Sequence, residues 1–112
     1  MKVCFNGIGQ QVVTFMDAGS VKGQVCKVSD GGTVAACADG DVFAGVVVYT
    51  DGSWADVQLK GYVTVPYTGT APAPGWCDMV GNGSGGVAVE DGGRSCLVVE
   101  VDTTAGTVGM FI

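Results

Sequence analysis

Apolar and polar residues alternate most regularly over residues 44–67, and this pattern predicts a β-hairpin. Residues 46–49 form an apolar run, 50–53 contain an Asp-Gly pair, and 55–65 alternate with period two. Period two is the spacing of a half-buried strand, and Asp-Gly between two such runs is a strong hairpin signal. One face is expected to carry Val57, Leu59, Gly61, Val63 and Val65, and the other Gln58, Lys60, Tyr62 and Thr64.

Gly61 occupies an inward position of this pattern without a side chain. A glycine inside a strand pattern marks a bulge, a tight bend or a close approach of another backbone. One of these three is therefore expected at Gly61.

Short apolar segments separated by Gly or Asp-Gly turns continue on both sides of the hairpin. Residues 11–16, 24–29, 33–38, 42–49, 76–80, 87–90, 95–102 and 107–112 are expected to be strands, and 3–5 is a further short apolar segment. Such spacing predicts an all-β fold, a small single-domain β-barrel or sandwich of about nine short, largely antiparallel strands with little or no helix. Residues 1–112 are expected to form one domain, with 1–16 an N-terminal arm or an edge strand.

Composition narrows the classes of partner. Hydrophobic residues make up 47% of the chain and charged residues 14%, which is enough apolar material for a packed core. The net charge of −6 repels phosphate backbones, so no nucleic-acid partner is expected. No signal peptide and no apolar run approaching the roughly 18 residues of a membrane span is visible, so no membrane partner is expected.

The chain contains no histidine, which removes the commonest general base and the commonest metal ligand. Its five cysteines, an odd number without a CxxC pair, are expected to be reduced and mostly buried, as in a protein that folds in a reducing cytoplasm. Neither a cysteine nucleophile nor a zinc site has the residues it needs. We therefore expect no enzymatic activity, no metal and no cofactor.

Three weaker patterns remain. Residues 81–86 fit GxGxxG, but the alternating segment that follows leaves no room for the helix of a dinucleotide site, so a turn is expected. Five acidic residues, most of them beside glycines at turn positions, are expected to cap turns; they are Asp39, Asp41, Asp51, Asp56 and Asp91. The aromatic residues Trp54, Tyr62, Tyr67 and Trp76 could either pack at a barrel end or form a platform for sugar rings.

Several segments taken in order resemble one family. These are residues 23–28 (GQVCKV), Gly40-Asp41, residues 43–47 (FAGVV), 57–65 (VQLKGYVTV), Gly75-Trp76 and 106–109 (GTVG). Over residue 21 to the C-terminus this arrangement is similar to the small β-rich head-decoration (capsid cement) proteins of tailed bacteriophages and prophages. The resemblance implies a non-enzymatic protein that binds the outside of an expanded head, often as a trimer, and reinforces it.

The same resemblance implies the major capsid protein as partner and the virion surface as location, after synthesis in the bacterial host cytoplasm. The candidate capsid or oligomer interface comprises Phe5, Val12, Val13, Phe15, Pro72 and Pro74. Residues 3–15 could add as a strand to a partner's sheet edge, or could simply be the first strands of the barrel. A small-ligand or carbohydrate-binding β-barrel module is the alternative function.

Overall fold

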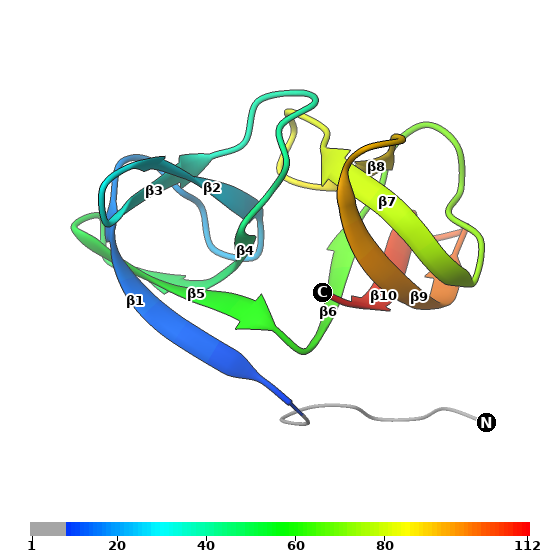
Figure 1. Ribbon diagram of the computed structural model, residues 1–112, viewed down its shortest axis with the longest axis horizontal. Coiled ribbons are helices and arrows are strands. Elements are labelled where there is room, and N and C mark those ends of the chain that lie inside the picture. Colours follow the sequence, from blue (N-terminus) through cyan, green and yellow to red (C-terminus); the bar gives the residue numbers. More distant parts are fainter. Residues whose placement is uncertain (1–8) are drawn as a thin grey trace.

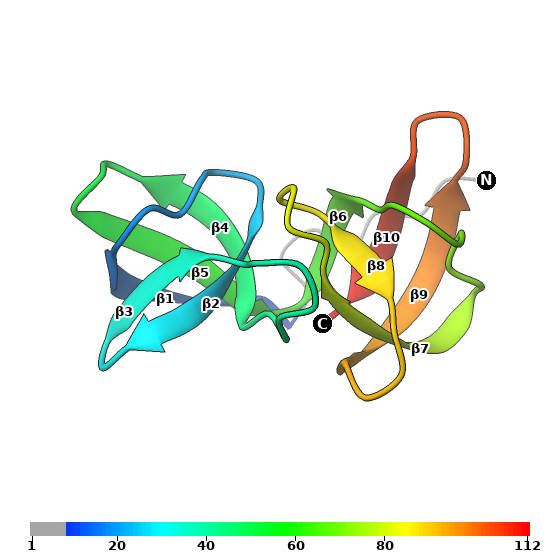
Figure 2. The same ribbon diagram turned by 90° about the horizontal axis from the view of Figure 1, so that it is seen from above.

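The computed structural model describes residues 9–112, which form ten strands and no helix (Figure 1). The strands are β1 (Gln11–Asp17), β2 (Val25–Asp30), β3 (Thr33–Ala36), β4 (Gly45–Thr50), β5 (Trp54–Lys60), β6 (Tyr62–Pro66), β7 (Gly75–Gly81), β8 (Val87–Val89), β9 (Arg94–Asp102) and β10 (Thr107–Phe111). The expected small all-β fold is confirmed, with ten strands instead of about nine. Two halves lie side by side along the long axis (Figures 1 and 2).

The first half is a closed barrel in the order β1-β3-β2-β4-β5, with β5 pairing back onto β1. Its pairs are antiparallel except for a short parallel contact between β1 and β3, where Met16 lies opposite Thr33. Closure removes both edges of the sheet. Of residues 1–16, expected to be an arm, an edge strand or the first strands of the barrel, the part from Gln11 onward lies in β1 and is paired on both sides in the barrel wall.

The second half is a five-stranded sheet in the order β6-β10-β9-β7-β8, antiparallel throughout. A parallel bridge joins Tyr67, just after β6, to Val87 at the start of β8, and the Thr68 amide donates to the Val87 carbonyl at 3.0 Å. The two edge strands of this sheet thus approach each other, so the sheet curls around its own core.

The expected hairpin is present as β4 and β5, but residues 55–65 are two strands in two different sheets. The break is Gly61, whose φ of 110° lies in the left-handed region that glycine tolerates. A Cβ on Gly61 would lie 3.0 Å from both the Gln10 Cα and the Gln58 Nε2, so the expected tight bend and close approach are confirmed together. The alternation of apolar residues continues through the bend, which is why the sequence pattern does not reveal it.

Gln58 lies on the face of β5 opposite to that of Val57, as expected, but this polar side chain is buried. Its amide nitrogen donates to the carbonyls of Lys60 and Tyr62, each at 3.2 Å, and its amide oxygen accepts from Gln10 at 3.2 Å. These bonds satisfy polar groups around the bend that burial would otherwise leave unpaired. Gln58 thus holds the crossover from the barrel to the second sheet.

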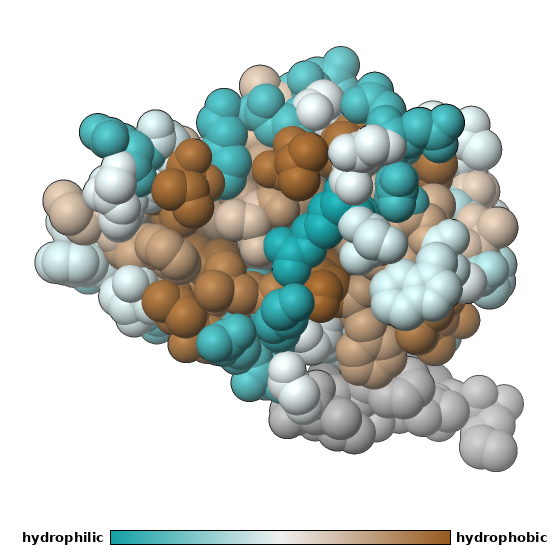
Figure 3. All heavy atoms as spheres, in the orientation of Figure 1, coloured by the Kyte–Doolittle hydropathy of each residue, from teal (hydrophilic) through white to brown (hydrophobic). Residues whose placement is uncertain are grey.

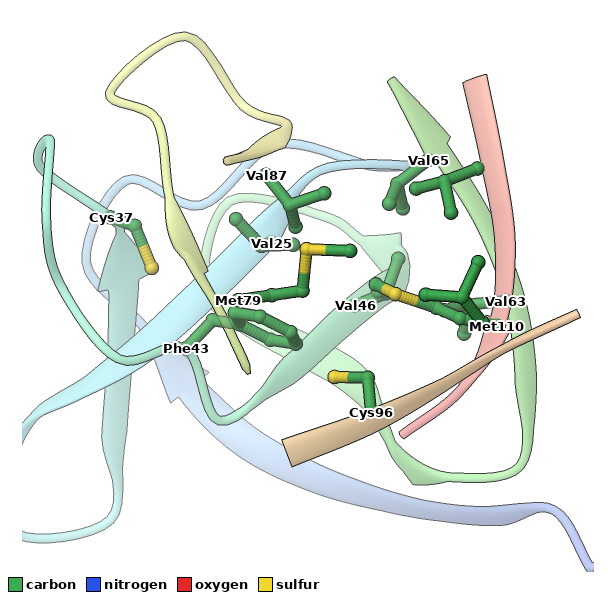
Figure 4. Packing of buried hydrophobic residues seen from close by; sticks show 12 residues of the cluster. Val25, Cys37, Phe43, Val46, Val63, Val65, Met79, Val87, Cys96 and Met110 are labelled. Carbon is green, nitrogen blue, oxygen red and sulfur yellow. The ribbon is translucent and has the colours of Figure 1, made fainter. Parts of the chain in front are cut away.

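Two apolar clusters form the core. The smaller one lies within the barrel and comprises Cys26, Val34, Val47, Ala55 and Val57. The larger one joins Val25, Phe43 and Val46 from the barrel side to side chains of the second sheet such as Met79 and Met110 (Figure 4). Neighbouring residues of β2 and of β4 enter different clusters, so both faces of these strands are buried. The two halves therefore share one core.

Arg94, on β9, fixes the boundary between the two halves. Its guanidinium donates to the carbonyl of Leu59 at 2.7 Å, to that of Phe43 at 3.3 Å and to that of Ala44, all on the barrel side. The guanidinium carbon also lies 5.5 Å from the centre of the Phe43 ring, a cation–π geometry. One side chain of the second sheet therefore satisfies three backbone carbonyls of the barrel.

Asp17, the last residue of β1, connects the turn that follows it to the end of β4. Its carboxylate accepts from the Thr50 hydroxyl and from the backbone amides of Gly19 and Ser20, at 3.1 and 2.7 Å. The Thr50 hydroxyl is the main cause that lowers the pKa of Asp17 to about 2 from a usual 3.8. The carboxylate therefore stabilises the folded state fully above about pH 4, and this contribution is lost as the pH falls toward 2.

We predict that Asp17→Asn will flatten the acid side of the stability profile. Wild type should lose thermal stability between about pH 4 and pH 2, because protonation weakens the bonds that the Asp17 carboxylate accepts. The variant should be less stable than wild type at pH 6 and should approach it at pH 2. Melting temperatures of both proteins across this range provide the test. A constant difference between the two curves would contradict the assignment.

Candidate functional site

The thiols offer no nucleophile among the described residues. Burial raises the pKa of Cys26 to about 12 and the pKa values of Cys37 and Cys96 to about 11 each. The pKa of the half-buried Cys77 is also raised, chiefly by burial. Three of the four are buried and Cys77 is half-buried, so the expected burial is confirmed for most of them, while their reduced state stays a prediction and Cys4 lies outside the described residues. A thiol with a raised pKa carries little thiolate at neutral pH and is a poor nucleophile.

Cys77 and Cys96 lie directly opposite each other on β7 and β9. The Asp78 carbonyl accepts from the Glu90 amide on the β8 side, so the backbone groups of Cys77 point toward β9. Cys77 and Cys96 therefore form a hydrogen-bonded pair. In such a pair the Cα atoms are about 5.5 Å apart, and the Cβ–Cβ distance is among the longer ones found between directly opposed strand residues. A disulfide prefers a Cβ separation of about 3.8 Å.

We predict that Cys77 and Cys96 stay reduced when the native protein is incubated with oxidised glutathione. Intact mass should show no loss of two hydrogens, and Cys77 should react faster with a thiol reagent than the three buried thiols do. Cys77→Ser is the control, which should remove that fast phase. A Cys77–Cys96 disulfide in peptide mapping of the native protein would contradict the register argument.

The acidic residues are spread over turns and strands and do not converge. Asp51 accepts from the amides of Ser53 and Trp54, both at 2.9 Å, and caps the β4–β5 turn as expected. Asp41 pairs with Lys27 at 2.7 Å, and Asp56 accepts from the Thr14 hydroxyl at 2.6 Å. In residues 9–112 no three His, Cys, Asp or Glu side chains come together in a way that could hold a metal ion.

The segment 81–86 is the expected turn, between β7 and β8. The Asn82 side chain organises it by accepting from the amides of Ser84 and Gly86 at 2.8 and 3.1 Å. No helix follows within the described chain, so the geometry that a dinucleotide pyrophosphate needs is missing there. The structure also contains no helix in residues 9–112 that is long and apolar enough to cross a membrane.

An open groove of about 390 Å³ lies where the barrel meets β6. Its lining consists of Lys22, Gly23, Val46, Val47, Val48, Gln58, Tyr62, Val63 and Thr64. The lining contains no carboxylate and no thiol, and Gln58 is already engaged by the bend. This groove therefore lacks a pair of groups for acid–base or nucleophilic chemistry.

The six predicted interface residues do not form one surface. Phe5 lies outside the described residues. Val12 is exposed, Val13 is half-buried, and Phe15 packs against the barrel core. In the loop before β7, Pro74 is exposed but Pro72 is buried. Of the described five, Val12 and Pro74 offer exposed side chains, whereas Phe15 and Pro72 are committed to packing within this chain.

An apolar row that we call the aromatic stripe crosses the outer face of the second sheet. Trp76 on β7 lies opposite Leu97 on β9, Leu97 lies opposite Phe111 on β10, and Phe111 lies opposite Tyr62 on β6. Directly opposed residues point to the same face of a sheet with Cβ atoms about 5 Å apart, so these four side chains form one continuous row. Trp76 is 74% exposed, and the other three are half-buried.

Gly109 gives the stripe its shape at one end. The Tyr62 hydroxyl occupies the space in which a side chain at 109 would lie, so the phenol ring crosses β10. The hydroxyl donates to the Glu100 carboxylate on β9 at 3.3 Å, and the Tyr62 and Phe111 rings meet edge to face with centres 5.3 Å apart. Burial and the Glu100 carboxylate raise the pKa of Tyr62. This end of the stripe therefore consists of two aromatic rings with a carboxylate beside them.

A second exposed apolar surface, the barrel patch, comprises Val12, Met16, Tyr49 and Trp54. Met16 on β1 lies opposite Trp54 on β5, and Tyr49 on β4 lies opposite Asp56, two residues further along β5. Met16, Tyr49 and Trp54 are each more than half exposed. Apolar side chains also reach the surface over the barrel in the view of Figure 3. The starts of β5 and β7, which carry the two tryptophans, lie at opposite ends of the molecule (Figures 1 and 2).

Sequence reasoning singled out Tyr62 and Trp76 of the stripe but not Leu97 or Phe111. It also grouped Trp54 and Tyr67 with them, whereas Trp54 belongs to the barrel patch and Tyr67 packs on the larger core cluster. The signal that unites the four stripe residues is the register of β6, β10, β9 and β7, which depends on long-range pairing. Comparison of the sequence with protein-family models and with curated proteins gave no match.

Proposed function

We propose that this chain is a head-decoration (capsid cement) protein of a tailed bacteriophage or prophage, a non-enzymatic component of the outer surface of the virion head. The observation that supports this most is that each half of the packed body carries exposed apolar side chains: Trp76 of the aromatic stripe in one half, and the residues of the barrel patch in the other. Exposed contiguous apolar side chains on a small folded protein mark interaction surfaces.

A cement protein has to hold two neighbours at once, and two separate surfaces on one shared core meet that need. The larger core cluster and the Arg94 contacts couple the halves, so a mechanical force applied to one surface is transmitted through the packed core to the other. The acidic turns, the thiols with raised pKa values and the groove, which has no carboxylate and no thiol in its lining, supply no reactive centre among the described residues. These features favour a structural role over catalysis.

The partner in this proposal is the major capsid protein, reached after synthesis in the cytoplasm of the bacterial host. Self-association into a trimer is part of the proposal, since one exposed surface can contact a second copy while the other contacts the shell. Light scattering on the purified protein tests this part. A monomer at tens of micromolar would remove the trimer in solution from the proposal.

Co-sedimentation with heads of the phage that encodes the chain tests the function. The protein should pellet with expanded heads at a fixed ratio of copies to capsid subunits, and should raise the temperature at which filled heads release DNA. Unexpanded shells serve as the comparison, because decoration is proposed for the expanded lattice. Absence of binding to expanded heads over a range of salt and protein concentrations would refute the proposal.

Binding of a carbohydrate is the second candidate, and exposed Trp76 is the observation that favours it. A flat indole with Asp78 two residues away on the same strand face could stack on a sugar ring and bond its hydroxyls. A glycan array separates the two functions. We expect no glycan to bind in a way that depends on Trp76, and a Trp76-dependent glycan would favour the carbohydrate-binding module.

A further inference from the structure

We propose that the aromatic stripe is the face that contacts the shell, and that it takes a segment of the capsid protein in which an apolar side chain is flanked by Lys or Arg. This inference rests on the proposed function and adds to it the surface used and the chemistry of the partner.

Trp76 is the anchor of this surface. Its side chain is the most exposed of the large apolar side chains in residues 9–112, at 74%. Leu97, directly opposite on β9, supplies a second apolar contact beside it. Binding energy in protein interfaces concentrates on a few such residues, and tryptophan is the most enriched among them. A partner side chain that covers Trp76 and Leu97 would remove both from water.

Carboxylates line this apolar row. Asp78 lies two residues from Trp76, on the same face of β7, and Glu100 accepts from the Tyr62 hydroxyl at the other end. The strands β6, β7, β9 and β10 contain one basic residue, Arg94, and its guanidinium is bound by barrel carbonyls. The charge at both ends of the stripe is therefore negative, and a partner with flanking Lys or Arg complements it.

A second copy of the chain is a poorer occupant. Two stripes facing each other across a two-fold axis would bring Asp78 and Glu100 of one copy toward the same carboxylates of the other. In a trimer the stripe would meet a different surface of the next copy, in a chain whose net charge is −6. Like charges brought together at an interface oppose association. The stripe therefore suits a different, basic protein.

The test measures binding to expanded heads of the encoding phage by co-sedimentation titration. Trp76→Ala should weaken binding by about 30-fold or more, the effect of losing an interface anchor. Val42→Ala, which truncates an exposed apolar side chain outside both surfaces, is the control and should bind within about twofold of wild type, as expected for a change that leaves the interface intact. Unchanged melting temperatures of both variants should show that folding is preserved.

The salt dependence of head binding tests the charge complementarity separately. Raising the ionic strength from about 0.1 M to about 1 M shortens the screening length from about 10 Å to about 3 Å and should weaken wild-type binding several-fold. The double variant Asp78→Asn/Glu100→Gln keeps the shapes of both side chains and should lose most of this salt response. An equal salt response in wild type and double variant would overturn the basic partner.

The outcomes separate the inference from the function on which it rests. If wild type binds heads and Trp76→Ala binds equally well, the stripe is not the shell-binding face and the inference fails while decoration stands. The inference also fails if Trp76→Ala changes only the oligomeric state. If wild type does not bind heads at all, both fail together.

Discussion

Replacing Arg94 with methionine is expected to lower the free energy of unfolding by about 3–5 kcal/mol, since a buried polar group left without its partner costs about 1–3 kcal/mol. The change removes the donor from the carbonyls of Phe43, Ala44 and Leu59, and it also removes the cation–π contact with the Phe43 ring. Domains of this size are stable by only about 5–15 kcal/mol, so the loss would be a large fraction of the total.

Urea denaturation followed by tryptophan fluorescence measures this effect. Arg94→Lys is the matched variant: it keeps the charge but replaces the planar fork with a single ammonium, so it should fall between wild type and Arg94→Met. If Arg94→Met cost less than about 1 kcal/mol, the value of an ordinary hydrogen bond, the boundary between the halves would not depend on this side chain.

Gly45→Ala is expected to have the second large effect. A Cβ at Gly45, the first residue of β4, would overlap the backbone carbonyl oxygen of Gln58 and come within 2.9 Å of a Val57 methyl group. Neither can move freely, because Gln58 and Val57 are buried in β5, which pairs with β4 on one side and β1 on the other. Overpacking of a well-packed core costs about 1–3 kcal/mol, and a clash with backbone places this site at or above about 3 kcal/mol.

Gly31→Ala is the matched control for Gly45→Ala. Gly31 lies in the exposed β2–β3 turn, its φ is not positive, and a Cβ there meets nothing within 4 Å. Its melting temperature should stay close to that of wild type. Equal losses in the two variants would mean that a general loss of glycine, and not the close approach of β4 and β5, governs stability.

The sequence pattern predicted the strands well because each strand is a local feature. The Asp-Gly turn and the apolar run before it located β4 and β5, and the glycine at 61 predicted a bend. Membership in a sheet was beyond the pattern, because Val57 and Val63 keep the same alternation although they belong to different sheets. The burial of Gln58 was not predicted, since its partners, the carbonyls around the bend, exist only once the chain has turned.

The candidate surfaces were predictable only in part. Trp76 was singled out as one of four aromatic residues that could form a binding platform. The rest of its row includes Leu97 and Phe111, which join it through strand pairings that no local pattern encodes. Phe15 was expected at an interface under the alternative in which residues 3–15 add as a strand to a partner's sheet edge. Closure of the barrel instead turns Phe15 against Cys26, Val34 and their neighbours in the barrel core.

Above all, we propose that this protein decorates the outside of an expanded phage head. Cryo-electron microscopy of expanded heads, with and without the purified protein, tests that claim directly. We predict additional density on the outer surface at symmetry-related positions, into which the barrel and the second sheet fit with the aromatic stripe toward the shell. Identical maps from the two samples, at a protein concentration well above that of the capsid subunits, would contradict it.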